Sequence, residues 1–435
     1  MMQILDFLNP YLPLLGQYFL LFWQIIKFWW WVLLPFLFWK PFLFLWLWRR
    51  REIFDSKIKR IILEIKLPRE IKKPIRAMED VFNVLHTIHD PPNWREKWLE
   101  GQFQLSFSLE IVSIGGEIHF YIRTPEMYRK LVESAIYAQY PEVEIFEAPD
   151  YTKNFPQDIP NKEWDVWGMN LDHTKPDCYP IKTYKRFEIE TQSLEEKRID
   201  PLSSLLEGLS VLTPGEYLCF QIIISPIRDE KPWVKEGKTI IDKLVKRPEK
   251  PKQKPLIKEA LDILIAGKPS SPSSGEKEVI PPEMKLTPGE REVVQAIEEK
   301  ISKFGFDCIM RYIYVGKREV FLKPRVRIPF SYLKTLSLEN LNGFRPLKGT
   351  VTKVKSIFWF LDKRRLYLRQ RRIFKGYCRR TGPFFPRPGG SFVLNTEELA
   401  SIYHFPGEMV ASTIGLKRIE ARKVEPPSNL PIEIE

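Results

Sequence analysis

The longest apolar run of the chain lies near its N-terminus and restricts what this sequence can fold into. Residues 14–48 are almost continuously apolar and hold seven of the 13 Trp, and the run ends at Arg49, Arg50 and Arg51. About 20 apolar residues, rising 1.5 Å each, cross the roughly 30 Å of hydrocarbon in a bilayer. We therefore predict an N-terminal membrane anchor over residues 1–51.

The apolar run is longer than one crossing needs, so a spanning helix would have to tilt or break. Pro35 and Pro41 are the expected break points, because proline removes an amide donor and clashes with the preceding turn. One crossing and a short hairpin both fit. Indole rings favour the membrane interface, where the ring stays apolar and its N–H stays hydrated. The expected interface residues are Trp29, Trp30, Trp31, Trp46, Trp48, Arg49, Arg50 and Arg51.

A cleaved signal peptide or a buried core helix would fit the apolar run less well. A signal peptide needs a basic start, but Asp6 stands there, and no small-residue cleavage site follows. A buried core helix is disfavoured by Trp and Phe on every face. Ten basic and four acidic residues lie between positions 49 and 73. The positive-inside rule then places the bulk of the chain on the cytoplasmic side of the inner membrane, with membrane lipid as one partner.

The rest of the chain is predicted to form two modules joined by a linker. The whole chain holds 37 Pro, which favours connected modules over one unit. Residues 246–285 are rich in Pro, Ser and charge and carry little apolar mass, so we interpret them as a linker. The first α+β module then covers 52–245 and the second covers 286–425. A Pro-rich tail occupies 426–435.

Local patterns predict the elements of both modules. An apolar stripe indicates a helix over 75–90, and alternating residues on either side of Gly115-Gly116 indicate a β-hairpin. Further helices are expected over 124–140, 200–209 and 288–304, and strands over 143–146, 187–191, 217–225 and 307–315. The expected fold class is α+β: an N-terminal transmembrane segment followed by two sandwich-like, ferredoxin-like modules joined by a Pro-rich linker.

Motifs for catalysis are weak in this sequence. His86, His89 and Asp90 lack a third ligand nearby and are typical of a polar helix end. Lys238 and its neighbours resemble the end of a nucleotide-binding loop, but Pro232 stands where the leading glycine should be. The four Cys are scattered without a metal-binding or disulfide spacing: Cys178, Cys219, Cys308 and Cys378. We expect no catalytic residue, no cofactor, no metal and no enzymatic activity.

One segment accounts for the net charge of +13. Residues 345–387 hold 14 basic residues and a single acid, Asp362, and aromatic residues alternate with the basic ones. Cations that neutralise phosphates, beside rings on which bases stack, are typical of nucleic-acid contact. The candidate residues are Lys363, Arg364, Arg365, Arg369, Arg371, Arg372, Lys375, Arg379 and Arg380. Anionic lipid headgroups and an acidic partner protein are alternatives that the sequence leaves open.

The C-terminal motifs carry a resemblance to a known group of proteins. Phe392–Glu408 (FVLNTEELASIYHFPGE) is followed by Arg418–Pro431 (RIEARKVEPPSNLP), and the segments EREVVQAIEEKISKFGFDCIMRYIY and LNGFRP precede them. Together they resemble the membrane-anchored region upstream of the motor in type IV secretion and conjugation-type, HerA/FtsK-like DNA-translocating ATPases. The resemblance covers roughly residues 95–431 and involves no catalytic residue.

The same C-terminal residues also predict a helix start from their own chemistry. Asn395 is a favourable N-cap, and Glu397 and Glu398 place carboxylates at the positive end of the helix. Leu399, Ile402 and Tyr403 would then face inward. An ordinary C-terminal helix and a partner-docking helix both fit this pattern.

The resemblance implies a function that the residues alone do not. No nucleotide-binding loop follows the matching segments before Glu435, so the resemblance implies the anchoring half, with the motor on a separate ATPase subunit. The expected function is a membrane-anchored, non-catalytic adaptor that places a DNA- or protein-translocating ATPase at the cytoplasmic face. The alternative is a membrane-tethered nucleic-acid-binding protein that uses residues 345–387, and self-association into a homo-oligomer stays open.

Overall fold

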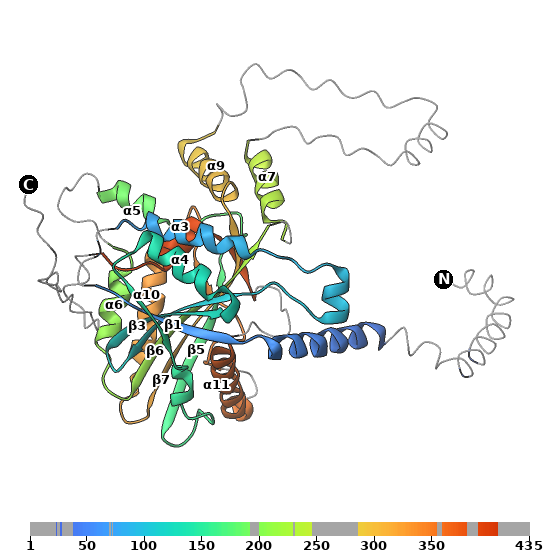
Figure 1. Cartoon of the computed structure of the whole chain (residues 1–435), viewed down its shortest axis with the longest axis vertical. Coiled ribbons are helices and arrows are strands. Elements are labelled where there is room, and N and C mark those ends of the chain that lie inside the picture. The colour runs from blue at the N-terminus through green and yellow to red at the C-terminus, as the bar shows by residue number, and fades with distance from the viewer. Residues whose placement is uncertain are drawn as a thin grey trace, which may run out of the picture. The chain divides into compact units, whose positions relative to one another are not determined.

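Figure 1 shows the computed structural model of the chain. It describes residues 23, 27, 38–68, 71, 73–191, 200–228, 231–245, 286–354, 359–380 and 390–407. The chain divides into two compact units. One contains the described residues up to Lys59 together with Asp90–Gln104, and the other contains Arg60–His89 and the described residues from Leu105 onward.

The second unit is built on one antiparallel sheet of nine strands. Eight of them run in the order β4-β1-β3-β2-β6-β7-β5-β8, and β9 pairs with β7 beside β5. All of the strand pairs are antiparallel. The strands are β1 (Arg60–Lys66), β2 (Phe107–Ile114), β3 (Glu117–Pro125), β4 (Glu144–Ala148), β5 (Trp164–His173), β6 (Glu216–Ile227), β7 (Gly305–Lys317), β8 (Phe344–Pro346) and β9 (Phe392–Asn395).

The pairing of β6 with β7 overturns the predicted pair of ferredoxin-like modules. These strands come from opposite sides of the predicted linker, yet they pair without interruption from Glu216↔Gly316 to Ile227↔Gly305. Both strands are long and buried on both faces, which suits the centre of a sheet. The fold is therefore a mixed α/β unit with one shared sheet. The predicted linker (246–285) and the tail (426–435) lie outside the described residues.

The predicted hairpin is confirmed. Gly115 and Gly116 join β2 to β3 with φ angles of 59° and 96°, a left-handed conformation that residues with a Cβ adopt only under strain. A Cβ on Gly116 would also lie 2.7 Å from the Leu212 carbonyl oxygen. The glycines thus serve both the turn and the close approach of a neighbouring loop.

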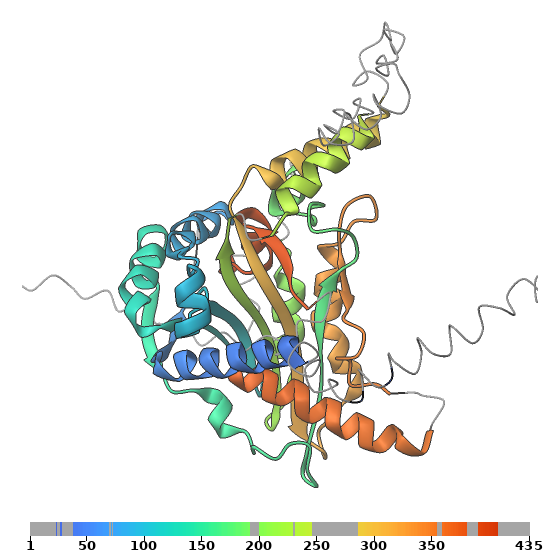
Figure 2. The same cartoon turned by 90° about the vertical axis from the view of Figure 1, so that its right-hand side faces the viewer.

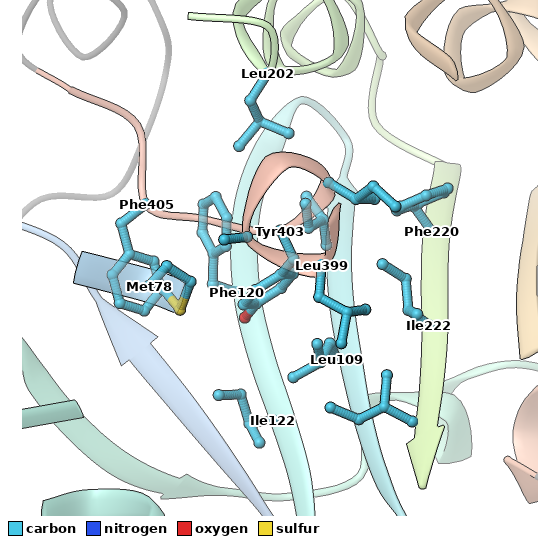
Figure 3. Close-up of a cluster of buried hydrophobic side chains, with 14 of the residues drawn as sticks. Met78, Leu109, Phe120, Ile122, Leu202, Phe220, Ile222, Leu399, Tyr403 and Phe405 are labelled. Atoms are coloured by element: carbon cyan, nitrogen blue, oxygen red, sulfur yellow. The ribbon is translucent and has the colours of Figure 1, made fainter. Parts of the chain in front are cut away.

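Helices cover one face of the sheet and enclose the larger core. α3, α4, α6, α10 and α12 place apolar side chains against the even-numbered residues of β3, β6 and β7. Figure 3 shows part of this core, where Leu399 and Tyr403 lie among Leu109, Phe120 and Phe220. The helices are α3 (Arg76–Leu85), α4 (Arg129–Gln139), α5 (Tyr184–Thr191), α6 (Ser203–Ser210), α7 (Trp233–Leu244), α9 (Pro288–Ile301), α10 (Ile328–Thr335), α11 (Asp362–Arg379) and α12 (Thr396–Ile402).

The helix start predicted at Asn395 is confirmed. Its side chain accepts from the Glu398 N–H while the Glu398 carboxylate accepts from the Asn395 N–H. Thr287 and Glu290 form the same reciprocal cap at the start of α9. The strand predicted over 187–191 is wrong, since these residues belong to α5.

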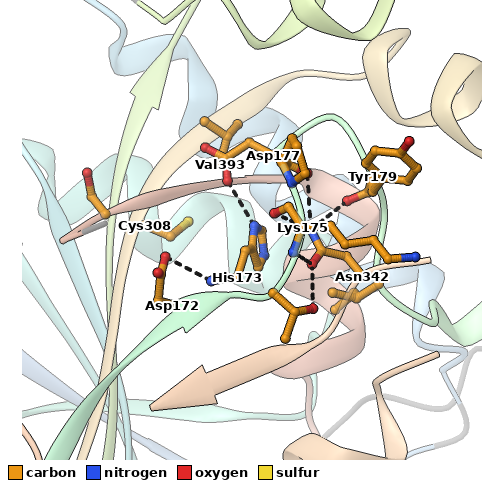
Figure 4. Close-up of polar contacts among 12 residues, drawn as sticks. Asp172, His173, Lys175, Asp177, Tyr179, Cys308, Asn342 and Val393 are labelled. Atoms are coloured by element: carbon orange, nitrogen blue, oxygen red, sulfur yellow. Dashed lines mark hydrogen bonds and ion pairs between the residues drawn. The ribbon is translucent and has the colours of Figure 1, made fainter. Parts of the chain in front are cut away.

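The sheet divides near the C-terminal end of β5. This strand pairs with β7 as far as Asn170↔Arg311 and then pairs with β8, while β7 continues with β9. Figure 4 shows His173 at the division, where its ring centroid lies 4.2 Å from that of Phe392 and its Nδ1 lies 2.9 Å from the Asp177 carboxylate. The imidazole thus fills the space between the diverging strands.

The first unit corrects the expected membrane anchor. Most of residues 14–48, including Trp29, Trp30 and Trp31, lie outside the described residues. A helix covers 38–57 and continues through the arginine triplet, so charged residues interrupt its apolar character. Within the described part of the chain, no helix is both long enough and apolar enough to cross a membrane. This finding contradicts the transmembrane segment of the fold that we expected from the sequence.

The remaining residues of the predicted membrane interface take part in contacts within the first unit. The Trp46 indole N–H donates to the Trp98 carbonyl oxygen at 2.9 Å, and the Arg50 guanidinium lies 4.6 Å from the Trp46 ring centroid. Arg49 pairs with Glu52 at 3.2 Å. Arg51 is exposed. The side chain of Trp48 is 40% exposed.

Candidate nucleic-acid interface

Within the basic segment, residues Asp362–Arg379 form one long helix, α11, on the second face of the sheet. Its 18 residues include one glycine and no proline. Asp362 lies in the first turn, where its carboxylate stabilises the helix by interacting with the positive end of the helix dipole. Ile373, Phe374 and Tyr377 are the buried residues of α11, and they fall on one side because residues 3 and 4 apart share a helix face. This side packs against the odd-numbered residues of β7, with Ile313 and Val315 in the same apolar cluster.

The sheet is shaped to receive the C-terminal half of α11. Gly168 in β5 leaves room for Ile373, since a Cβ on that glycine would lie 3.2 Å from the Ile373 Cγ1. Phe155 packs edge-on against Phe374, with ring centroids 6.2 Å apart. The N-terminal half differs, because none of the residues 362–372 is buried. In Figure 2 the first turns of α11, in orange, extend beyond the strands.

A row of polar side chains crosses the sheet beneath the end of α11. The strand registers place Tyr121, Glu110, Gln221 and Arg311 side by side on β3, β2, β6 and β7. Glu110 is fully buried and accepts from Ser108 Oγ at 2.6 Å and from Gln221 Nε2 at 2.9 Å. A buried carboxylate needs such partners to offset the loss of its hydration.

Arg380 completes this row and locks the helix end to the sheet. It stands directly after α11 with φ 53°, a left-handed conformation that is rare for residues with a Cβ. Its Nε and Nη2 donate to the two carboxylate oxygens of Glu110 at 2.6 and 3.1 Å. Its Nη1 and Nη2 donate to the Asp150 carboxylate at 2.9 and 3.0 Å. The ion pairs hold the unfavourable backbone conformation in place.

The charges of this cluster shift pKa values in the directions that a buried ion-pair network requires. Burial alone would raise the pKa of Asp150, but its hydrogen bonds and attraction to Arg380 lower it below the usual range. Burial and the charge of Glu110 raise the pKa of Tyr151 well above the usual range. Burial, with the nearby charge of Arg380, lowers the pKa of Arg123 to about 10. At neutral pH Asp150 is therefore ionised and the Tyr151 phenol is neutral, which suits an anchor.

The nine predicted basic residues differ in burial and in their hydrogen-bond partners. Arg380 is buried in the network above, so it is not available to a polyanion. Arg369 donates from Nη1 to the carbonyl oxygens of Val351 and Lys353, at 3.3 and 3.2 Å, and Arg371 donates to the Tyr367 hydroxyl at 2.7 Å. The remaining six lie on the exposed or half-buried sides of α11: Lys363, Arg364, Arg365, Arg372, Lys375 and Arg379.

The residues that fix α11 in place were not predicted from the sequence. Glu110, Asp150 and Tyr151 lie far from the basic segment along the chain, and no local pattern links them to it. One signal was available: Glu110 is the single charged residue of a strand that otherwise holds apolar residues and two serines, and a charge in such a strand needs a buried partner.

A second polar cluster holds Cys308 and His173, residue types that catalysis often uses. Burial raises the pKa of the Cys308 thiol well above its usual range, which keeps it protonated and unreactive. Burial also lowers the pKa of His173. Among the residues that the structure describes, no group of three or more His, Cys, Asp or Glu is arranged to hold a metal ion.

A cavity of about 420 Å³ lies among α5, α9 and the start of α12. Three cations line it, and each faces a carboxylate: Lys185 with Glu397 at 2.8 Å, Arg186 with Glu292 at 2.6 Å, and Lys300 with Glu398 at 3.0 Å. These pairs balance the charge of the cavity wall. Compared with this cavity, α11 therefore carries more exposed basic side chains, and it is the better candidate for binding a polyanion.

Comparison with known protein families identifies the domain but not its activity. A family profile described as "Domain of unknown function (DUF8128)" matches residues 52–330, which is more than half of the chain. A search of curated proteins finds no match. The matched residues end within α10, before α11, β9 and α12, although all three pack on the same sheet. The chain belongs to the DUF8128 family of domains of unknown function.

Proposed function

We propose that this protein is a nucleic-acid-binding scaffold that presents α11 as a rigid basic surface. The observation that carries this proposal is that the residues that pack α11 on the sheet are different from the basic residues that it exposes. Ile373, Phe374, Tyr377 and the adjoining Arg380 seat it on the sheet, while basic residues occupy its outward sides. A fixed helix needs no ordering when a ligand binds, so its cations can contact phosphates at little entropic cost.

The test measures binding of the full chain to fluorescein-labelled DNA by anisotropy at several salt concentrations. The key variant replaces Arg372, Lys375 and Arg379 by Ala, which removes three exposed cations without touching a buried residue. Each phosphate contact contributes about 0.9 to the slope of log K against log salt. We expect the variant to bind at least tenfold more weakly and to lose roughly 2.7 from that slope.

A matched control removes the same charge elsewhere. Lys235, Lys238 and Lys243 are exposed on α7, and replacing them by Ala should leave the affinity and the slope unchanged. Equal losses in both variants would mean that net charge, not α11, attracts DNA, and the proposal would fail. Vesicles that contain phosphatidylserine form a further arm: binding to vesicles but not to DNA would assign the basic surface to lipid instead.

We propose further that the scaffold serves a separate DNA-translocating ATPase. What supports this is the resemblance carried by Phe392–Glu408 and the segments before it. The residues of that stretch up to Gly407 are built into the same core as the DUF8128 domain, as β9 and α12. α12 is buried along its whole length, so the core helix is not itself a docking surface. The partner would have to contact another part of the molecule.

An ATPase assay tests the partnership. The assay takes as partner a Walker-type ATPase encoded in the same gene neighbourhood, and measures its DNA-dependent ATP hydrolysis with and without the scaffold. We expect stimulation that the Arg372, Lys375 and Arg379 triple variant abolishes. If the scaffold binds DNA but leaves hydrolysis unchanged, the ATPase partnership is rejected and the DNA-binding function stands.

A further inference from the structure

We infer that the N-terminal half of α11 enters the major groove of B-form DNA. This inference rests on the proposed nucleic-acid binding and names the form of nucleic acid that the helix accepts. Three observations carry it: the helix half extends from the sheet, its cations point to several sides, and its dimensions match the groove.

The first observation is the exposure of the N-terminal half. The burial of α11 begins at Ile373, and its side-chain bonds to β5 are made by Gln370, whose Nε2 donates to the Asp165 carboxylate at 2.8 Å and to the Val166 carbonyl oxygen at 2.7 Å. The two turns before these contacts leave Leu368 half exposed. Figure 2 shows this part of the helix running out past the strands. Within the second unit, Lys363, Arg364 and Leu368 are exposed in this half, whereas Arg369 is held by the carbonyl oxygens of Val351 and Lys353.

The second observation is the arrangement of charge around that half. Lys363, Arg364 and Arg365 are consecutive, and consecutive residues of an α-helix are about 100° apart around its axis. Lys363 and Arg364 are exposed and Arg365 is half-buried, and the three positions are spread over roughly 200° of the helix circumference. A flat anionic surface, such as a bilayer, would contact only one side of this arrangement. A groove with a phosphate backbone on each wall would contact all of it.

The third observation is that the diameter of the helix matches the width of the major groove and that further cations follow along the helix. An α-helix with side chains is about 10–12 Å across, and the major groove of B-DNA is about 12 Å wide. The major groove of A-form RNA is deep and too narrow for such a helix. Beyond the exposed half, Arg372, Lys375 and Arg379 continue along the outward side of α11. From Arg364 to Arg379 the helix rises roughly 22 Å, so these residues can follow a phosphate backbone beyond the groove.

The experiment compares four ligands by anisotropy with the full chain. They are a 20-bp DNA duplex, one of its strands alone, the RNA duplex of the same sequence, and a DNA duplex whose major groove is filled by glucosylated 5-hydroxymethylcytosine. We expect the plain DNA duplex to bind at least tenfold more tightly than the other three. Netropsin, which occupies the minor groove, should leave duplex binding unchanged.

Two triple variants separate groove contact from backbone contact. Replacing Lys363, Arg364 and Arg365 by Ala should remove the preference for duplex over single strand. Replacing Arg372, Lys375 and Arg379 should weaken both ligands by the same factor and keep the preference. Neither variant alters a buried residue, and circular dichroism checks that the fold is retained.

The outcomes distinguish this inference from the function on which it rests. If the single strand, the RNA duplex or the glucosylated duplex binds as tightly as plain DNA, or if netropsin competes, groove insertion is rejected while nucleic-acid binding stands. If none of the four ligands binds, both fail together.

Discussion

Removing the charge of Glu110 should strongly destabilise the sheet unit. Glu110 has no exposed surface and accepts two hydrogen bonds from Arg380, one from Ser108 and one from Gln221. In Glu110→Gln the shape is kept but the acceptor charge is lost. Breaking a buried ion pair by changing one partner costs about 3–5 kcal/mol. Because Asp150 still accepts two bonds from Arg380, we expect the lower end, about 3 kcal/mol.

Guanidinium unfolding of the full chain, followed by circular dichroism, measures this loss. The single variants Glu110→Gln and Arg380→Met and their double variant form a cycle. The double variant should be more stable than the sum of the single losses predicts, by about 2 kcal/mol, because it no longer leaves one buried charge alone.

An exposed arginine with two carboxylate partners provides the control. Arg129 contacts Glu133 at 2.8 Å and Glu147 at 2.6 Å, but its side chain is 38% exposed. In Arg129→Met, water can replace the lost guanidinium as the partner of these two partly exposed carboxylates, so this change should cost much less than Arg380→Met. Equal losses for the two arginines, or strictly additive losses in the cycle, would show that burial does not couple the network and would refute the argument.

Three further predictions concern other parts of the chain. The pKa of Asp150 is lowered in the folded protein, so its carboxylate adds stability above its ordinary value of 3.8, and this contribution disappears as the pH falls through the folded pKa. The variant Asp150→Asn should therefore be less stable than the original protein at pH 7. On acidification to pH 2 the variant should lose less stability than the original protein does, as measured by thermal melts. The same acid dependence in both proteins would contradict this. Deleting residues 381–435 removes β9 and the fully buried α12, where each large apolar side chain contributes about 1.5–3 kcal/mol. The shortened chain should show no cooperative melt, and a melt like that of the full chain would be the contrary result. Gly101→Ala should loosen the first unit, because Gly101 has φ +78° and a Cβ there would lie 2.3 Å from the Arg50 carbonyl carbon. Faster proteolysis within the helix over 38–57 is the measurement, and Gly289→Ala, whose Cβ would meet nothing within 4 Å, is the control.

Local structure was the part that the sequence predicted well. The helix expected over 75–90 is α3, continued by a single 3₁₀ turn, and the strand expected over 307–315 is β7. Asn395 caps its helix as expected, and Leu399, Ile402 and Tyr403 face inward. These features depend on neighbours within a few residues, where capping chemistry and periodicity act.

Two local errors have the same cause, which is that tertiary contacts override a weak local preference. Residues 187–191 have strand-like composition but form the end of α5. Thr124 and Pro125 looked like a helix start, yet both extend β3, and α4 begins at Arg129. In the second case Thr124 pairs with Ile61 of β1, a partner more than 60 residues away. Propensity is a weak guide where a strand neighbour is available.

By itself, the sequence determined where charge and apolar residues are concentrated, the hairpin at Gly115-Gly116, and the cap at Asn395. Only the tertiary structure decided that β6 and β7 share one sheet and that Arg380 faces inward while Arg379 faces outward. The physical reason is range. Caps, turns and periodicity are set by neighbours in the chain, whereas strand partners and the burial of a charge depend on residues that only the folded chain brings together, such as Glu110 with Arg380.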